Sequence, residues 1–263
     1  MPLYTDTFFT CYVLILSFIL GTVFGSFINC MASRIVAGEN WLKGRSHCDA
    51  CGHVLKAVDL IPVVSYLIQH GKCRYCGKKM SSRYMWTEVC MGLAFVGVVL
   101  NYGALNFHVL RDWALICILL GLSLVDLETY EIPDGFIIAG LVIWAVTIPL
   151  MKLDGVDIGS YVKTGLLGGV GIAGGMLVIS LIMDKILKKE SLGGGDVKLL
   201  FMVCLYLGLA QGLLCLILAC MIGLCFVLLL KKGKIAFGPS ISLAVYLVLI
   251  IGPEVVSWYF GLF

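Results

Sequence analysis

Apolar residues in this chain gather into long continuous blocks, and polar residues collect in the segments between them. Such a block crosses a lipid bilayer as a helix when it has roughly 17–25 residues. Eight blocks reach or approach this length, near residues 8–30, 85–101, 109–126, 135–151, 161–183, 197–210, 210–230 and 239–260. The sixth and seventh share one apolar stretch that only the segment 208–212 interrupts. The pattern predicts an all-α polytopic membrane protein with about eight transmembrane helices.

Composition supports a membrane protein. Sixty per cent of the residues are apolar, 13% are charged, and the mean hydropathy is +1.03, which lies outside the range of a soluble domain. The first six residues contain no Lys or Arg, so we expect the first apolar block to be a retained span rather than a cleaved signal peptide. Glycines in the first and fifth blocks suit close helix packing.

Basic residues predict the orientation in the membrane. With eight spans, 16 of the 19 Lys and Arg residues fall on one face, and only Arg111, Lys152 and Lys163 fall on the other. By the positive-inside rule the polar loop after the first span is cytoplasmic, and both termini lie outside. We divide the chain into a first transmembrane helix (1–34), a cytoplasmic loop domain (35–84) and a transmembrane domain (85–263).

Four of the twelve cysteines lie in that loop, in the pattern C-x-x-C…C-x-x-C. They are Cys48, Cys51, Cys73 and Cys76, and a glycine follows each pair. Four thiolates leave zinc no open position, so the pattern predicts a structural Zn²⁺ site. Disulfides are the alternative, but the cytosol is reducing. The flanking His47 and His53 are expected to be bystanders, or at most to support the ligands.

Two aspartates lie at matching depth. Asp126 ends a helix that enters the cytoplasmic face, and Asp196 follows three glycines at the start of a helix that leaves it. Asp196 is expected at the N-cap, where the helix dipole favours a negative charge, whereas the C-terminal position of Asp126 disfavours one. Two carboxyl groups that approach each other share a proton, as in aspartic proteases. A helix cap and a solvated loop acid are the alternative interpretation.

These segments together resemble the type IV prepilin peptidases, which are bifunctional leader peptidases and N-methyltransferases of bacterial membranes. The resemblance spans nearly the whole chain. It rests on Gly25–Asn29 with Arg34, the four cysteines, Asp59–Ser65 as D-x-x-P-x-x-S, Arg83-Tyr84 leading to Glu88, Asp126 with Ile132–Asp134, Gly193–Asp196 with Lys198, and Phe237–Pro239.

The resemblance implies that the enzyme removes the short basic leader of prepilins or pseudopilins at the cytoplasmic face of the inner membrane. It also implies methylation of the new N-terminal residue with S-adenosylmethionine. Asp126 and Asp196 would carry proteolysis, and the zinc-loop side would carry methyl transfer. Asn29 and Arg34, where the first span meets the loop, are candidate contacts for S-adenosylmethionine. Glu88 is a further functional candidate or an ion-pair partner of a nearby arginine.

Two other functions fit parts of the pattern. One is an intramembrane protease of the G-x-G-D type without methyl transfer; against it, Asp126 follows Val125 rather than a tyrosine, and such enzymes have no zinc loop. The other is a non-enzymatic transporter with a zinc-bound docking loop, because paired membrane carboxylates also relay protons. We expect prepilin substrates and membrane lipid as partners, and no nucleic acid. The particular substrate and the oligomeric state do not follow from the sequence.

Overall fold

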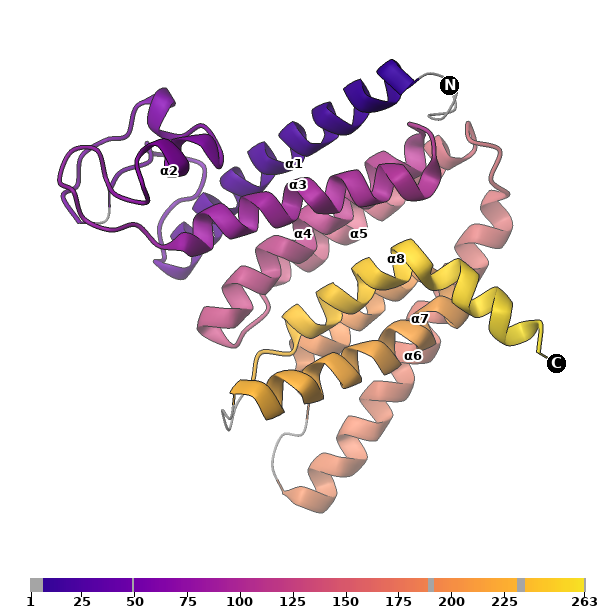
Figure 1. Ribbon diagram of the computed structural model, residues 1–263. Coiled ribbons are helices and arrows are strands. Elements are labelled where there is room, and N and C mark those ends of the chain that lie inside the picture. Colours follow the sequence, from indigo (N-terminus) through magenta and orange to yellow (C-terminus); the bar gives the residue numbers. More distant parts are fainter. Residues whose placement is uncertain (1–6, 49, 189–191, 231–234, 263) are drawn as a thin grey trace. The chain divides into compact units, whose positions relative to one another are not determined.

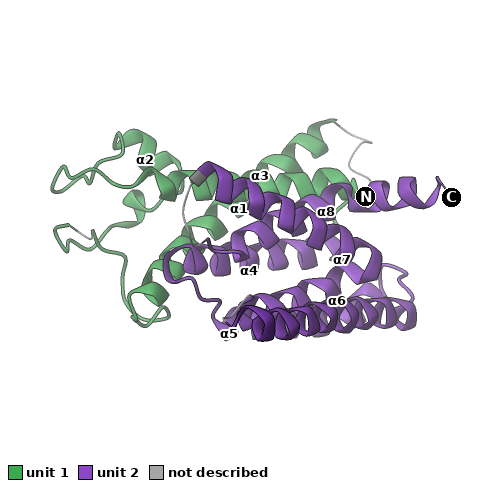
Figure 2. Ribbon diagram, turned by 90° about the horizontal axis from the view of Figure 1, so that it is seen from below, with its two compact units in different colours: residues 1–105 green, residues 106–263 purple. Residues whose placement is uncertain are grey.

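The computed structural model describes residues 7–48, 50–188, 192–230 and 235–262. Residues Glu190 and Ser191, which precede the three glycines before Asp196, lie outside the described residues. So do the basic residues Lys189, Lys231, Lys232 and Lys234. The chain forms two compact units, with the division between Leu105 and Asn106. Figure 2 colours them separately, and each is described by itself below.

Long helices account for most of the described chain (Figure 1). Their bounds are α1 Thr7–Val36, α3 Ser82–Tyr102, α4 Phe107–Thr129, α5 Asp134–Met151, α6 Ile158–Leu187, α7 Gly194–Leu230 and α8 Gly238–Phe260. These are the seven described helices that are long and apolar enough to cross a membrane. The all-α polytopic prediction is confirmed. Seven helices stand where the sequence predicted eight spans, because the sixth and seventh predicted spans are joined in the element α7.

Unit 1 is built on the pair α1 and α3, which run side by side. Glycines on α1 make the close approach possible: a Cβ on Gly21 would lie 2.6 Å from the carbonyl oxygen of Met91, and one on Gly25 would lie 3.0 Å from the Met91 Cβ. The same helix pair is joined by the buried side chain of Asn29, which donates to the hydroxyl of Thr87. The glycines of the first span therefore serve helix packing, as predicted.

The polar loop of unit 1 leaves from one end of this pair and contains two short helices, η2 Ala57–Asp59 and α2 Val64–Ile68. Isolated antiparallel bridges join His47 to Val54 and Lys72 to Lys79. Each bridge closes a tight turn around one Cys-x-x-Cys pair. With so little regular structure, the loop has little apolar core of its own.

Unit 2 contains α4 to α8, and α7 packs against both α6 and α8. Small residues again set the distance between helices. A Cβ on Gly165 of α6 would lie 2.6 Å from the carbonyl oxygen of Leu205, and one on Gly168 would lie 2.6 Å from the carbonyl carbon of Gly208. The backbones of α6 and α7 are therefore almost in contact, which only glycine allows.

The element α7 is not one straight rod. Gly208 has φ 73° and ψ −175°, a conformation that only glycine adopts readily. A Cβ on Gly212 would lie 3.0 Å from the Sγ of Cys204, although eight residues of continuous helix would separate them by about 12 Å. The helix therefore folds back at Gly208, inside the segment where the sequence predicted the division between two spans.

Candidate functional site

Asp126 lies in the last turn of α4 and is 3% exposed. The helix ends at Thr129. The next residue, Tyr130, adopts a left-handed conformation, and its N–H donates to the carbonyl of Asp126. The Asp126 carboxylate accepts the N–H of Gly238, the first residue of α8, at 2.8 Å. Because the first N–H groups of a helix have no partner within the helix, this contact caps α8 and stabilises negative charge on Asp126.

Asp196 occupies the third position of α7 rather than the N-cap that the sequence suggested. The helix begins at Gly194, and the N–H of Asp196 donates to the carbonyl of Gly193 at 3.0 Å. The carboxylate in turn hydrogen-bonds to the backbone of Gly193. The side-chain contact is one half of a capping box, with an aspartate in the place of the usual glutamate, and the other half is missing because Gly193 has no side chain.

The carboxyl groups of Asp126 and Asp196 lie close enough to interact electrostatically. Their segments also meet directly, because a Cβ on Gly195 would lie 3.1 Å from the Cβ of Ile132. Unit 2 thus brings together two acids that are 70 positions apart in the sequence. Each carboxylate lies at the N-terminus of a helix, α8 for Asp126 and α7 for Asp196, so the dipole of α4 is not the only one that acts on Asp126.

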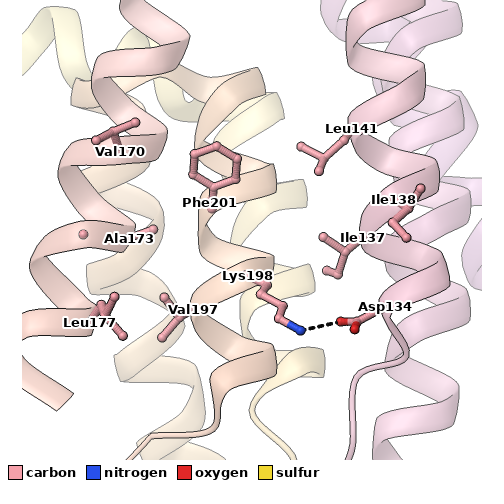
Figure 3. Close-up of a pocket in the computed structure, with 11 residues that line it drawn as sticks. Asp134, Ile137, Ile138, Leu141, Val170, Ala173, Leu177, Val197, Lys198 and Phe201 are labelled. Carbon is pink, nitrogen blue, oxygen red and sulfur yellow. Dashed lines mark hydrogen bonds and ion pairs between the residues drawn. The ribbon is translucent and has the colours of Figure 1, made fainter. Parts of the chain in front are cut away.

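Figure 3 shows a groove between α5, α6 and α7. Its lining includes Val197 and Lys198, which directly follow Asp196 in the sequence. Lys198 donates to Asp134 at 2.7 Å at one end of the groove, and apolar side chains such as Ile138 and Phe201 line the rest. Side chains two positions apart on a helix point about 160° away from each other. The ion pair therefore ties α5 to α7 on the far side of α7 from Asp196.

The four loop cysteines form one cluster. Their Sγ atoms all lie within 4.8 Å of one another, and those of Cys48 and Cys76 are 3.9 Å apart. A tetrahedral zinc ion with bonds of about 2.3 Å needs sulfurs about 3.8 Å apart, so this donor set fits zinc. The two pairs lie in turns of the same kind. In the first, the N–H of Gly52 donates to the carbonyl of Cys48, and in the second the N–H of Gly77 donates to the carbonyl of Cys73.

Electrostatics within the cluster distinguish the thiols. Hydrogen bonds from the backbone of Ala50 and Cys51 lower the pKa of Cys48 to about 7. At Cys76 the backbone of Lys78 favours the thiolate, but burial and hydrogen bonds with the other three cysteines raise the pKa to about 11. One thiolate is thus favoured before any metal arrives. His53 stacks on Tyr75 with ring centroids 3.7 Å apart, and neither it nor His47 belongs to the cluster.

Asp59 supports the second cysteine pair, Cys73 and Cys76. Its side chain, 2% exposed, accepts from the side chain of Gln69 at 3.1 Å and the hydroxyl of Tyr75 at 2.9 Å, and it pairs with Arg74 at 3.6 Å. Burial raises the pKa of Asp59, but these groups together with the N–H of Lys56 outweigh it and lower the pKa overall. Arg74 and Tyr75 are the two residues between Cys73 and Cys76, so the D-x-x-P-x-x-S segment braces the metal site.

The other candidates in unit 1 have identified contacts. Asn29 is 2% exposed and joins α1 to α3, as described above. The Nη1 atom of Arg34 donates to the carbonyl of Lys43 at 3.2 Å and holds the start of the loop. Glu88, 7% exposed, accepts the N–H of Val63 at 2.7 Å. A role for Asn29 or Arg34 toward S-adenosylmethionine stays a prediction.

Sequence reasoning missed one buried charged group in unit 2. Arg111 and Asp112 lie near the start of α4, 5% and 0% exposed, and the Nη2 and Nε atoms of Arg111 both contact Oδ1 of Asp112, at 2.7 and 2.8 Å. Arg111 also donates to the hydroxyl of Tyr161 at 3.1 Å and lies over the ring of Tyr206. The adjacent acid and base in an otherwise apolar span were the available signal.

Comparison with known proteins agrees with this geometry. Residues 19–102 match the bacterial peptidase A24 N-terminal domain, and residues 113–228 match the type IV leader peptidase family. A type 4 prepilin-like proteins leader peptide-processing enzyme of Escherichia coli is 34% identical over 76% of this chain and 72% of its own length. The chain belongs to the type IV leader peptidase family.

Other members of the family have lower identity. The prepilin leader peptidase/N-methyltransferase of Bacillus subtilis is 26% identical over 92% of this chain and 96% of its own length. The protein of the same name from Myxococcus xanthus is 29% identical over 72% of this chain, which spans 55% of that relative. No solved structure matches this family member. The seven apolar helices and the family together make it a multi-pass membrane protein.

Proposed function

We propose that this protein cleaves the leader peptide of type IV prepilins or prepilin-like proteins and then methylates the new N-terminal residue with S-adenosylmethionine. The observation that carries the proposal is the interaction of buried Asp126 with Asp196 at the start of α7. It occurs in a member of a leader peptidase family whose relatives are named prepilin leader peptidase/N-methyltransferase.

Proteolysis follows from the chemistry of two adjacent carboxyl groups. Two carboxyl groups that approach each other hold one proton between them, because ionising both would place like charges together. The ionised carboxylate takes a proton from a water molecule, and the protonated one polarises the scissile carbonyl. The Gly238 N–H holds Asp126 in place for this step, and the Gly193 backbone holds Asp196.

The loop domain is proposed to hold a structural zinc ion on Cys48, Cys51, Cys73 and Cys76. Bound zinc would supply folding free energy to a loop with little core, about 10–16 kcal/mol in zinc-finger peptides. The division of the chain into a first helix (1–34), a zinc-binding domain associated with methyl transfer (35–84) and a peptidase domain (85–263) remains part of the proposal. So do contacts of S-adenosylmethionine with Asn29 and Arg34.

We also propose that the protein lies in the bacterial inner membrane, with the zinc loop and both aspartates at the cytoplasmic face. The distribution of Lys and Arg supports this orientation, because 16 of 19 fall on that face when eight spans are counted. A basic leader peptide would then reach the pair from the cytoplasm.

The decisive experiment is co-expression with a candidate prepilin, followed by mass spectrometry of the processed pilin. We expect Asp126→Asn and Asp196→Asn each to reduce cleavage by about 10²–10⁴-fold. Glu254→Gln changes an exposed acid of α8 and should leave cleavage intact. Cleavage that survives both aspartate substitutions would refute the proposal, and cleavage without an added methyl group would favour the protease without methyl transfer.

Zinc is tested on the purified protein by metal analysis. About one zinc per chain is expected, because the four thiolates complete one tetrahedral site, and Cys73→Ser should remove most of it. Cys220→Ser serves as the control, since that cysteine is an exposed residue of α7. Equal zinc content in the two variants would contradict the proposed site.

A further inference from the structure

The loop of unit 1 contains one strained turn. Val63 has φ 61° and ψ −51°, and the N–H of Val64 donates to the carbonyl of Pro62 at 2.6 Å. These features define a γ-turn of the rare, strained form, and a β-branched residue at positive φ is a genuine outlier. Such strain persists only where the surroundings impose it. Here the carboxylate of Glu88 accepts the N–H of Val63.

The turn sits in the middle of an exposed apolar stripe. We define the stripe as five residues that are 41–66% exposed: Leu60, Ile61, Val64, Leu67 and Ile68. The other side of the same segment is occupied, because Ser65 donates to the carbonyl of Val58 and Gln69 donates to Asp59. The polar side chains thus face the zinc loop, and the stripe faces away from it.

Contacts with α3 fix the depth of the stripe. Glu88 lies in the second turn of α3, a helix apolar enough to span the membrane. Two aromatic residues among the first five of α3, Tyr84 and Trp86, are 38% and 57% exposed, as is typical of the belt at a membrane–water interface. Because Val63 is bonded to Glu88, the stripe lies at or just inside the level of this belt. Figure 1 shows α2 near the end of the α1–α3 pair from which the loop leaves.

We propose that the segment Leu60–Ile68 is a membrane-surface element whose apolar stripe inserts into the lipid leaflet on the zinc-loop side. Lipid is the occupant because the hydrogen bond from Val63 to Glu88 holds the stripe beside the end of a membrane-spanning helix, at interfacial depth. Lys56 and Lys72 flank the segment and can meet anionic phosphate head groups. An amphipathic segment with this division of faces lies in the plane of the interface. The strained turn and Glu88 hold it there.

The test uses the unmodified full-length protein in nanodiscs of zwitterionic and anionic phospholipids that carry a photoreactive diazirine in the acyl chain. After irradiation and digestion, lipid adducts are mapped by mass spectrometry. We expect the peptide with Leu67 and Ile68 to carry adducts at least about fivefold more often than the peptide with Val54. Val54 is the matched control, because it is an apolar loop residue with 44% exposure in the first cysteine turn.

Two results would overturn the proposal. One is labelling of the Leu67 peptide at the level of the Val54 peptide, while exposed Leu93 of α3 is labelled strongly. The other is loss of the adducts when a prepilin is added, which would make the stripe a substrate-binding surface. The double substitution Leu67→Gln/Ile68→Gln should lower labelling of this peptide and leave that of Leu93 unchanged. Failure of leader cleavage alone would not affect either readout.

Discussion

At the scale of single residues, the approach of Asp126 to Gly238 is the contact on which the aspartate pair depends most closely. A Cβ at position 238 would lie 2.6 Å from the Asp126 Oδ2, too close for any side chain. Gly238→Ala should push the carboxylate off its N–H donor. Because a displacement of about 1 Å can cost about 10²-fold in rate, we expect cleavage of a prepilin to fall by that factor, measured as kcat.

The matched control is Gly135→Ala, a glycine at the start of α5 with no atom of the described residues within 4 Å of its would-be Cβ. This variant should cleave at the unaltered rate. A Gly238→Ala protein that is equally active would show that Asp126 does not need its contact with α8.

Residue identities were more predictable than their surroundings. The sequence marks Asp126, Asp196 and the four cysteines, because carboxylates in membrane spans and paired thiols in a short loop are uncommon. It does not reveal that the Asp126 carboxylate caps α8 at Gly238, since 112 positions separate the two residues and the contact depends on how α4 packs on α8. The strained turn at Val63 was equally hidden, because valine normally argues against a positive φ.

At the scale of elements, the fold-back within α7 depends on Gly208. Its φ and ψ are essentially restricted to glycine, and the break frees carbonyl groups of the preceding turn. The indole N–H of Trp144 donates to one of them, that of Leu205, at 3.0 Å. Gly208→Ala should therefore destabilise unit 2 by about 1–3 kcal/mol, detected as a lower Tm in detergent.

Gly175→Ala is the comparison for this substitution, since Gly175 lies within α6 with no described atom within 4 Å of its would-be Cβ. Alanine there should keep or slightly raise the Tm, because glycine costs about 0.8–1.0 kcal/mol in a helix interior. Equal Tm values for the unaltered protein and Gly208→Ala would mean that the break is not a rigid feature.

Apart from the division inside α7, helix boundaries followed from hydropathy within six residues, whereas buried polar contacts between helices did not. The sequence identified Arg111 only as one of three basic residues on the side of the membrane that has few of them. In the structure it is buried with Asp112 and bonded to Tyr161 of α6. That environment depends on which helices surround α4, and a pattern read along one segment contains no such information.

At the scale of the whole molecule, the fold-back decides on which sides of the membrane the chain begins and ends. A straight α7 would give seven crossings and place the two termini on opposite sides. Because α7 reverses at Gly208, we expect it to cross the membrane twice, which gives the described helices eight crossings and places the two termini on one side. In the proposed orientation sixteen basic residues face the cytoplasm, so we expect both termini on the outer side of the membrane.

Reporter fusions measure this directly. Alkaline phosphatase joined to the C-terminus should be active, and green fluorescent protein at the same place should be dark, because the first folds only outside the cytoplasm and the second only within it. Fusions after Leu230, which retain seven crossings, should give the opposite pair of results, and this truncation is the internal control. A fluorescent C-terminal fusion would mean that α7 crosses once, and the aspartate pair would then lack the half of unit 2 that the fold-back builds.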